Sequence, residues 1–452
     1  MKKTLIIASV LMAMLFAGCS KDTDETKNQV LPEVNQITLT VSAVTKTPNV
    51  SGEAQTRIAY GSTDATWETG DKIFLIKSDG TTITLTLSSG AGTSVGSFTS
   101  TDPVAAGTYT PYAVSASSLS KGYVSVAGGE ITLDLTEGGG GTLADALEHD
   151  ILKGTAVALT ENQATAEIEG LTTHMLSYLR FQFAATAKAV STIGVSSTGG
   201  INQTVTIAAN GTVTGSNSTT SAINVTAGDN GANTYAGYIA VYGSTSTSLV
   251  AHAEDAEGGK YSRLVSTKTA NYTAGKVYGK SFTLTDNMMN AAATGTLSDQ
   301  NWKNLGLSVK WSDRYVYASD EYAYNTSFDT NGDTNPPASW SGWRHPTREE
   351  VNELYYASTL EWISSGPNGM KFNCNDNYIA MGASGYHYDW EVGDRDDYVG
   401  ERAYFFINET SGSNRSWAVI TSTGFSFETP NSRCTNVRCF TYYGAMRLVC
   451  DY

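Results

Sequence analysis

Residues 36–44 read Gln-Ile-Thr-Leu-Thr-Val-Ser-Ala-Val, and this stretch decides the class of the fold. Apolar residues at 37, 39, 41 and 43 alternate with polar residues at 38, 40 and 42. Successive side chains of a β-strand point to opposite faces, so the pattern predicts a strand with one buried face.

Similar short runs recur as far as about residue 286, with turn residues between them and little helical periodicity. They are Trp67–Ile76, Thr82–Leu87, Gly107–Tyr112, Ala164–Ile168, His174–Phe183, Thr204–Ile207, Tyr235–Tyr242, Ser262–Ser266 and Ala274–Leu284. Regularly spaced short strands are typical of β-sandwiches. We therefore expect two sandwiches in series, over residues 36–155 and 156–286.

The N-terminal end has the pattern of an export signal. Met1-Lys2-Lys3 is basic, Thr4–Phe16 is apolar, and Ala17-Gly18-Cys19 follows. This order predicts a signal peptide over residues 1–18, because the apolar run is too short to span a bilayer. A Cys after Ala-Gly resembles the bacterial lipobox, which implies a diacylglycerol on Cys19 and a membrane anchor. The alternative is an ordinary signal peptide with a Cys there by chance.

Residues 19–35 form a polar tether that begins Cys19-Ser20-Lys21-Asp22-Thr23-Asp24-Glu25. The acidic stretch resembles the segment that routes some lipoproteins to the outer face of the outer membrane. A plain solvated linker is the alternative. The net charge of −15 argues against nucleic acid as a partner, because phosphates require basic patches.

The composition changes near Asp286. Residues 287–300 are predicted to be a linker, and residues 301–452 hold seven of the eight tryptophans. Most of these rings are expected in a core. Thr347 and Glu350 have the spacing of a capping box, and Val351, Leu354 and Tyr355 follow at helical spacing. We predict a helix there that packs on a sheet.

The cysteines after Cys19 all lie near the C-terminal end: Cys374, Cys434, Cys439 and Cys450. In an exported domain they are candidates for disulfides, with three possible pairings. Zinc is a weaker interpretation, because the chain has no Cys-x-x-Cys motif and no His near these thiols in sequence.

Residues 36–286 resemble the fimbrillin family of anchored pilus subunits from Gram-negative bacteria. The resemblance rests on Thr56-Arg57, Trp67 with Gly70-Asp71, Tyr109-Thr110-Pro111-Tyr112, the strand at His174, and Ala274-Gly275-Lys276-Val277-Tyr278. It implies two transthyretin-like β-sandwiches. It also implies that His174 packs or hydrogen-bonds rather than catalyses.

In that family a trypsin-like protease cuts after an Arg that follows the first strand, and a strand of the next subunit fills the groove. The resemblance implies that Arg57 is this processing site. Lys46 is a second basic candidate, and a plain surface charge at Arg57 is the alternative.

Residues 300–452 resemble the major paralogous domain of Fibrobacter-type surface proteins, which is related to C-type-lectin-like folds. The resemblance rests on Leu305–Trp311, Gly342–Leu354, Ile379–Tyr386 and Tyr442–Val449. The Tyr-Trp-Ser-Ser run often seen in that family is replaced by Tyr404-Phe405-Phe406. The overall expectation is thus a mainly β chain with two transthyretin-like sandwiches and an α+β C-type-lectin-like domain over 301–452.

An acidic, aromatic stretch gives the candidate ligand-binding residues of this domain: Tyr386, Tyr388, Trp390 and Asp394. The alternative is a solvated loop. The oxygen-rich turn Asp329–Asp333 lacks the full spacing of a calcium loop, so no metal and no cofactor are expected. No catalytic motif is present, so we expect no enzyme; a formylglycine-generating-type enzyme is kept as a rival.

These patterns favour a surface-exposed lipoprotein of the outer membrane that forms part of a fimbrium. A C-terminal domain that ends in its own core strand favours a tip subunit. The expected partners are other fimbrial subunits, the membrane through the lipid, and a host or bacterial surface glycan or protein. A non-polymerising glycan-binding surface lipoprotein is the alternative.

Overall fold

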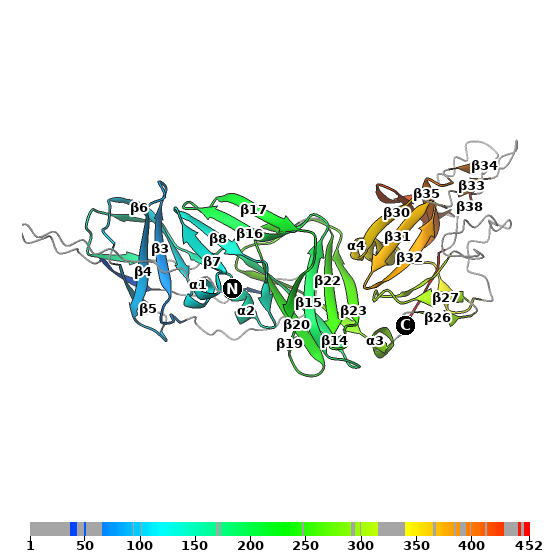
Figure 1. Cartoon of the computed structure of the whole chain (residues 1–452), viewed down its shortest axis with the longest axis horizontal. Helices are drawn as coiled ribbons and strands as arrows, with labels where there is room; N and C mark the ends of the chain where they lie inside the picture. The colour runs from blue at the N-terminus through cyan, green and yellow to red at the C-terminus, as the bar shows by residue number, and fades with distance from the viewer. Residues whose placement is uncertain are drawn as a thin grey trace, which may run out of the picture.

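The computed structural model describes residues 37–42, 49–50, 66–93, 95–100, 102–168, 171, 173–245, 248–290, 294–298, 300–314, 340–364, 368–383, 386–388, 395–397, 399–411, 414–428, 442–443 and 447–452. Over these residues the chain forms nine sheets and four helices, which confirms the predicted mainly β class. The sheets follow one another along the long axis of the molecule (Figure 1). No helix in the described ranges is long and apolar enough to cross a membrane.

The first sheet contains the strand predicted over residues 36–44. Its order is β12-β1-β5-β4-β3-β6-β10-β13, and β11 also pairs with β6. Every neighbouring pair is antiparallel except β1 with β12, which is parallel. The strands are β1 (Ile37–Ser42), β3 (Lys72–Lys77), β4 (Thr82–Ser89), β5 (Val95–Ser100), β6 (Gly107–Val114), β10 (Leu152–Lys153), β11 (Val157–Leu159), β12 (Thr165–Ile168) and β13 (Thr173–His174).

Strand β3 is buried on both faces because a hydrophobic core lies on each side of the first sheet. Ile73 and Leu75 belong to one core, together with Trp67 and Phe98. Phe74 and Ile76 belong to the other, which continues into the next sheets. This explains why the β3 sequence is a continuous apolar run rather than an alternating one.

Two further sheets enclose a third core and together form the second sandwich. One has the order β19-β20-β14-β25-β2, with β9 also on β20; the other has the order β18-β15-β22-β23. Phe181, Phe183, Ile193 and Ile239 are buried between them. The strands are β2 (Asn49–Val50), β9 (Gly139–Gly140), β14 (Ser177–Ala185), β15 (Val190–Ser197), β18 (Ile223–Thr226), β19 (Gly228–Asp229), β20 (Thr234–Val241), β22 (Leu249–Asp255), β23 (Lys260–Ser266) and β25 (Lys276–Leu284). A small ladder joins β21 (Ser244–Thr245) to β24 (Ala270–Asn271).

The predicted boundary between residues 155 and 156 is wrong, because the two sandwiches exchange strands. β11 and β12 lie after the boundary but pair with β6 and β1 of the first sheet. β8 (Glu130–Asp134) lies before it but pairs with β16 (Ile201–Ala208), in a sheet completed by β7 (Val124–Ala127) and β17 (Val213–Thr219). Alternation identifies strands but not the partners with which they pair.

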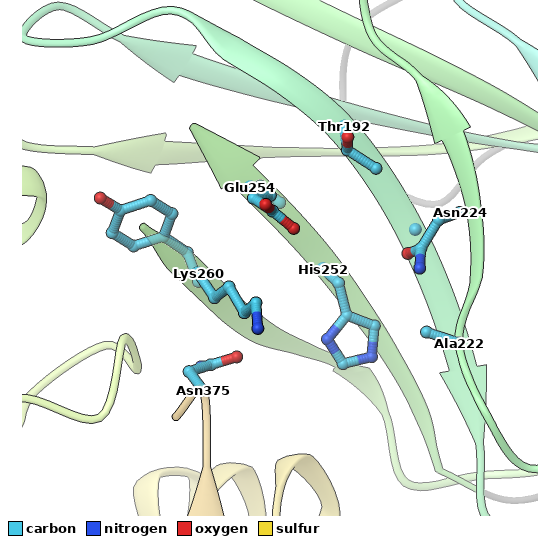
Figure 2. Close-up of a pocket in the computed structure, with 10 residues that line it drawn as sticks. Thr192, Ala222, Asn224, His252, Glu254, Lys260 and Asn375 are labelled. Carbon is cyan, nitrogen blue, oxygen red and sulfur yellow. The ribbon is translucent and has the colours of Figure 1, made fainter. Parts of the chain in front are cut away.

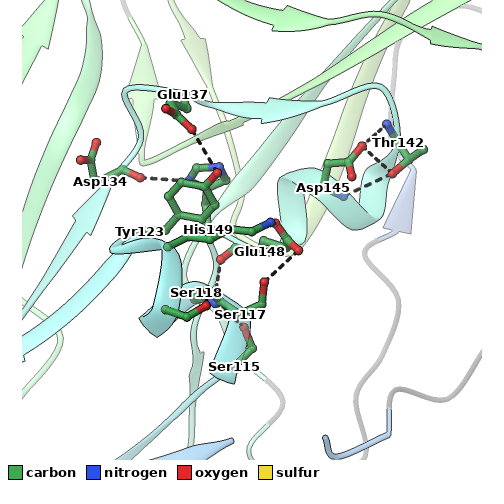
Figure 3. A network of polar contacts seen from close by, with 12 residues as sticks. Ser115, Ser117, Ser118, Tyr123, Asp134, Glu137, Thr142, Asp145, Glu148 and His149 are labelled. Atoms are coloured by element: carbon green, nitrogen blue, oxygen red, sulfur yellow. Dashed lines mark hydrogen bonds and ion pairs between the residues drawn. The ribbon is translucent and has the colours of Figure 1, made fainter. Parts of the chain in front are cut away.

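A polar network links the two short helices between the sandwiches, α1 (Ala116–Lys121) and α2 (Leu143–Leu147) (Figure 3). The ring of His149 stacks on Tyr123 at 3.9 Å, and its Nδ1 lies 2.9 Å from the carbonyl of Asp134. Glu148 accepts a hydrogen bond from Ser117 and pairs with Lys121. Burial lowers the pKa of His149, so this ring is neutral at pH 7 and serves a structural role.

The C-terminal unit begins earlier than predicted, within the expected linker of residues 287–300. Strand β26 (Thr294–Leu297) lies there and is the edge of the sheet β26-β27-β28-β39-β29. The other strands of this sheet are β27 (Gln300–Lys303), β28 (Lys310–Ser312), β29 (Trp343–Arg344) and β39 (Val449–Cys450). Helix α3 (Asp286–Asn290) comes before β26, and its Met289 is buried in the core that Phe181 and Ile193 share.

Three more three-stranded sheets complete the described part of this unit. They are β30 (Thr359–Ile363), β31 (Gly369–Cys374) and β32 (Asn377–Gly382); β33 (Tyr386–Tyr388), β34 (Arg395–Asp397) and β38 (Tyr442–Tyr443); and β35 (Arg402–Ser411), β36 (Asn414–Thr421) and β37 (Gly424–Glu428).

Helix α4 (Arg348–Ala357) confirms the predicted capping box. The Thr347 side chain accepts the N–H of Glu350 at 3.2 Å, and the Glu350 carboxylate accepts the N–H of Thr347 at 2.8 Å. Val351 and Leu354 are buried in the main core of the unit, as the helical spacing predicts. Trp311, Trp343 and Trp417 are also buried, as expected for core aromatics.

Candidate functional site

The first strand occupies an interior position of the first sheet. β1 pairs antiparallel with β5 on one side and parallel with β12 on the other. The register places Leu39 opposite both Phe98 and Ala166, and Val41 opposite both Gly96 and Ile168. Without β1, both β5 and β12 would lose a neighbouring strand.

The β1 neighbours belong to a tightly packed core. Phe98 and Ile168 are almost fully buried, and the Phe98 ring meets Trp67 edge-on at 4.8 Å. Gly96 lies under these rings, because a Cβ there would be 2.9 Å from both Phe98 and Trp67 and 2.7 Å from Leu87. This wall of the β1 position therefore has little room to adjust.

The same N-terminal segment also reaches the second sandwich. β2 pairs in parallel with β25, with Asn49 opposite Lys276 and Val50 opposite Val277. β1 and β2 thus attach residues 37–42 and 49–50 to two different sheets. The predicted processing residue Arg57, its alternative Lys46 and the predicted lipidation residue Cys19 lie outside the described residues.

His174 is part of a buried hydrogen-bond hub centred on Asp150. Its Nδ1 lies 2.6 Å from Asp150 Oδ2, which also accepts the Tyr178 hydroxyl at 2.6 Å. Asp150 Oδ1 accepts the backbone N–H groups of Ile151, Met175 and Leu176. Burial raises the pKa of Tyr178 well above its usual range. His174 therefore has the hydrogen-bonding role that the resemblance implied.

The C-terminal unit is docked on β23, the edge strand of the second sandwich. The N–H of Ser262 donates to the carbonyl of Gly306 at 2.9 Å, and Arg263 donates to the same carbonyl at 2.9 Å. The N–H of Leu264 faces Oε1 of Glu353 at 3.4 Å. The contact uses backbone donors at alternate positions of the edge, which are the groups that an added strand would use.

Buried side chains of the C-terminal unit hold this contact in place. Glu353 is buried in α4, and its Oε2 accepts the N–H and the hydroxyl of Ser308 at 2.8 and 2.5 Å. Tyr452 donates to Asn304 at 2.5 Å, and burial raises its pKa above the usual range. The docking surface is therefore a polar network that is satisfied internally.

Two of the four candidate disulfide cysteines are free thiols in the structure. Cys374 and Cys450 are buried, and burial raises their pKa to about 12 and about 11. Thiols with such pKa values are unreactive near neutral pH. Cys434 and Cys439 lie outside the described residues, so their pairing stays a prediction.

Of the candidate ligand-binding residues, the structure describes the backbone of two. Tyr386 and Tyr388 lie in β33, where Tyr388 is opposite Arg395 on one side and Tyr442 on the other. Trp390, Asp394 and the oxygen-rich turn 329–333 lie outside the described residues. Within the described ranges, no three His, Cys, Asp or Glu side chains are grouped to hold a metal ion.

Sequence reasoning missed two features that join parts of the chain far apart in sequence. One is the Asp150 hub, and the other is the docking of Gly306 and Glu353 on β23. Neither has a local motif.

No protein-family model matches the chain, and no curated protein matches it in sequence. Several solved structures overlap with part of it. A candidate cell adhesion protein of Bacteroides fragilis is 17% identical, covers 57% of this chain and 95% of its own, and has a TM-score of 0.33. A candidate cell adhesion protein of Bacteroides ovatus is 12% identical, covers 54% and 91%, and has a TM-score of 0.35.

The tip fimbrial protein Mfa3 of Porphyromonas gingivalis, solved with a C-terminal truncation, also overlaps. It is 10% identical, covers 51% of this chain and 81% of its own, and has a TM-score of 0.25. With TM-scores of 0.25 to 0.35, these overlaps assign no role to this chain.

Proposed function

We propose that the protein is a non-enzymatic, surface-exposed subunit of a fimbrium that is assembled by β-strand addition. The observation that carries the proposal is the interior position of β1 between β5 and β12. Removal of this N-terminal strand would leave two strand edges unpaired. An incoming strand would restore both ladders through main-chain hydrogen bonds, and its alternating side chains would set the register.

Cleavage after Arg57 would detach β1 and β2 together, since both precede it in the chain. The pairing of β2 with β25 supports a groove that extends from the first sheet to the second sandwich. Cys19 would leave with the same segment. In this proposal the lipid delivers the subunit to the outer membrane, and the cut that frees the subunit also opens the groove.

We further place the subunit at the tip of the fimbrium. β39 lies between β28 and β29, and Leu448, Val449 and Cys450 are buried. Donation of this strand to a neighbour would open the C-terminal sheet. A subunit that accepts a strand and passes none on ends a polymer. Its C-terminal unit is then free to contact a glycan or protein on a host or bacterial surface.

The processing step is tested by N-terminal sequencing of the protein released from intact cells. We expect released protein to begin at Ile58. The variant Arg57→Ala should stay attached to the cell and form no detergent-stable polymer, whereas Lys46→Ala should behave as wild type. A released form that begins at Cys19, or within β3 to β6, would contradict the proposal.

The tip position is tested separately, by immunogold labelling with antibodies against residues 301–452. We expect label at the ends of fibres. Label along the whole length of the fibres would indicate a shaft subunit, and label on the cell body alone would indicate a non-polymerising surface protein.

A further inference from the structure

A pocket of about 150 Å³ lies where the second sandwich meets the C-terminal unit, on the outer face of the sheet β18-β15-β22-β23 (Figure 2). Two rows of residues paired across the strands form its base. One row is Asn224, Gly194 and His252; the next is Thr192, Glu254 and Lys260. Asn375, from the β31–β32 turn of the C-terminal unit, closes one side.

The floor of the pocket depends on Gly194. This glycine is in the middle of β15 and has no left-handed φ, so the backbone does not require glycine there. A Cβ at this position would lie 2.0 Å from Oδ1 of Asn224. Glycine at 194 therefore allows the Asn224 side chain to lie across the floor of the pocket.

The wall formed by His252 is held on both sides. Its Nε2 lies 2.7 Å from the Ser196 hydroxyl, and its Nδ1 lies 2.9 Å from the Ser262 hydroxyl. Ser262 donates its only hydroxyl proton to Asn375 Oδ1 at 3.1 Å. Nδ1 must therefore donate to Ser262, which leaves Nε2 to accept from Ser196. Burial lowers the pKa of His252 to about 4, so the imidazole is neutral near pH 7, and the two serine contacts fix its orientation.

The opposite wall is also fixed. Asn375 donates to the carbonyl of Leu305 at 2.7 Å, and Asn375 and Asp376 have left-handed φ values of 49° and 66° in a tight turn. Asp376 pairs with Lys260 at 2.6 Å. The second sandwich and the C-terminal unit therefore both contribute rigid polar groups to the pocket rim.

Three polar side chains around this floor make no hydrogen bond to another described residue. Over the described part of the chain, the Thr192 hydroxyl, the Asn224 amide and the Glu254 carboxylate make no hydrogen bond or ion pair to other side chains or backbone groups. Figure 2 shows them on the same side of the sheet as His252. Together they offer donors and acceptors to a molecule in the pocket.

We propose that this pocket binds a neutral, hydroxyl-rich ligand of the size of one sugar ring. The Lys260 ammonium is shared between its ion-pair partner Asp376 and the nearby Glu254, so the pocket offers no unpaired positive charge to an anionic ligand. The hydroxyl groups of a sugar both donate and accept hydrogen bonds. They can therefore bind the amide of Asn224, the hydroxyl of Thr192 and the carboxylate of Glu254 at the same time. The volume equals that of roughly five water molecules at about 30 Å³ each, which limits the ligand to a single ring.

The site is separate from the strand position around β1 and does not depend on the proposed assembly. Its test uses the full mature chain and the methyl glycosides of glucose, galactose, mannose and N-acetylglucosamine, by saturation-transfer NMR and calorimetry. We expect at least one glycoside to bind with a Kd on the order of 1 mM. No binding by any of the four at about 20 mM, or binding of ethylamine in their place, would overturn the proposal.

Variants locate the binding within the pocket. Asn224→Ala and Glu254→Gln should each weaken binding by about tenfold, the effect of losing one hydrogen bond to a ligand. Neither side chain makes a hydrogen bond to a described residue, so both variants should unfold as wild type does. Thr226→Ala is the matched control, since Thr226 is exposed on the same strand as Asn224 but does not line the pocket. Equal binding by Asn224→Ala and Thr226→Ala would refute the site.

Discussion

The backbone N–H of Ser262 donates a hydrogen bond of 2.9 Å to the carbonyl of Gly306, which joins the edge of the second sandwich to the C-terminal unit. Gly306 has a φ of +67°, and a Cβ there would lie 2.2 Å from the carbonyl oxygen of Lys260. Only glycine combines this backbone conformation with so close an approach. The C-terminal unit is therefore seated on β23 at a position that tolerates no side chain.

We predict that Gly306→Ala releases the C-terminal unit from β23. The new methyl group would force the chain away from Lys260 and break the bond to Ser262. Hydrogen exchange at the Ser262 amide should accelerate at least tenfold, which corresponds to about 1.4 kcal/mol.

Gly258→Ala is a matched control for this variant. Gly258 lies in the turn between β22 and β23 and has a φ of +88°, but a Cβ there would meet nothing within 4 Å. Gly258→Ala should cost about 1 kcal/mol through backbone strain, and hydrogen exchange at the Ser262 amide should stay slow. Equal acceleration in both variants would mean that strain, not the close approach, governs the contact.

His252 makes the stability of this contact depend on pH. Burial lowers the pKa of His252 from 6.5 to about 4. Between these two values the unfolded chain binds a proton that the folded chain resists, so stability falls as the pH falls. The contribution is complete above pH 6.5 and lost by about pH 4. Its upper limit is roughly 3 kcal/mol, and partial exposure of the ring reduces it.

Urea unfolding at pH 7.5 and pH 4.5 measures this dependence. His149, whose pKa is also lowered by burial, acts in the same direction. The comparison must therefore be made between wild type and His252→Gln, which has no titratable group at this position. We expect a smaller loss of stability on acidification in the variant. An identical loss in both proteins would show that His252 does not carry the effect.

We predict that neutralising Asp150 lowers the free energy of unfolding more than neutralising any other polar residue described in the sandwich region. Its two oxygens accept five hydrogen bonds, from His174, Tyr178 and three backbone N–H groups. Asn has one acceptor oxygen, so Asp150→Asn leaves buried donors unsatisfied. We expect a loss of about 2–4 kcal/mol in the free energy of unfolding.

Glu161→Gln controls for the loss of a negative charge, because Glu161 is exposed and has no hydrogen-bond partner among the described residues. Its stability in urea should be within about 0.5 kcal/mol of wild type. A similar small effect for Asp150→Asn would show that the hub contributes little.

Local pattern accounts for many of the elements but not for their pairing. The alternation at 36–44 predicts β1, and the spacing of Thr347 and Glu350 predicts the start of α4. The register of β8 against β16 joins segments about seventy residues apart, and no local periodicity reports it. The same is true of the pocket floor. The role of Gly194 there depends on Asn224 and His252, which pair with it from the two neighbouring strands.

The position of β1 yields a prediction at Gly96, which is paired with Val41. Any Cβ at Gly96 would lie within 2.9 Å of Leu87, Phe98 and Trp67, all of which are held in or against the same core. Gly96→Val should therefore displace these rings and destabilise the β1–β5 ladder. We expect a loss of about 1–3 kcal/mol, measured by urea unfolding.

The effect should be local to the first sheet. Exchange at the β5 amides that pair with β1 should accelerate, while exchange in β14 and β20 of the second sandwich stays unchanged. Gly424→Ala is the control, because a Cβ there meets nothing within 4 Å and the backbone φ is not left-handed. If Gly96→Val unfolded as wild type does, the wall beside β1 would be adaptable, and an incoming strand could differ widely from β1 in its side chains.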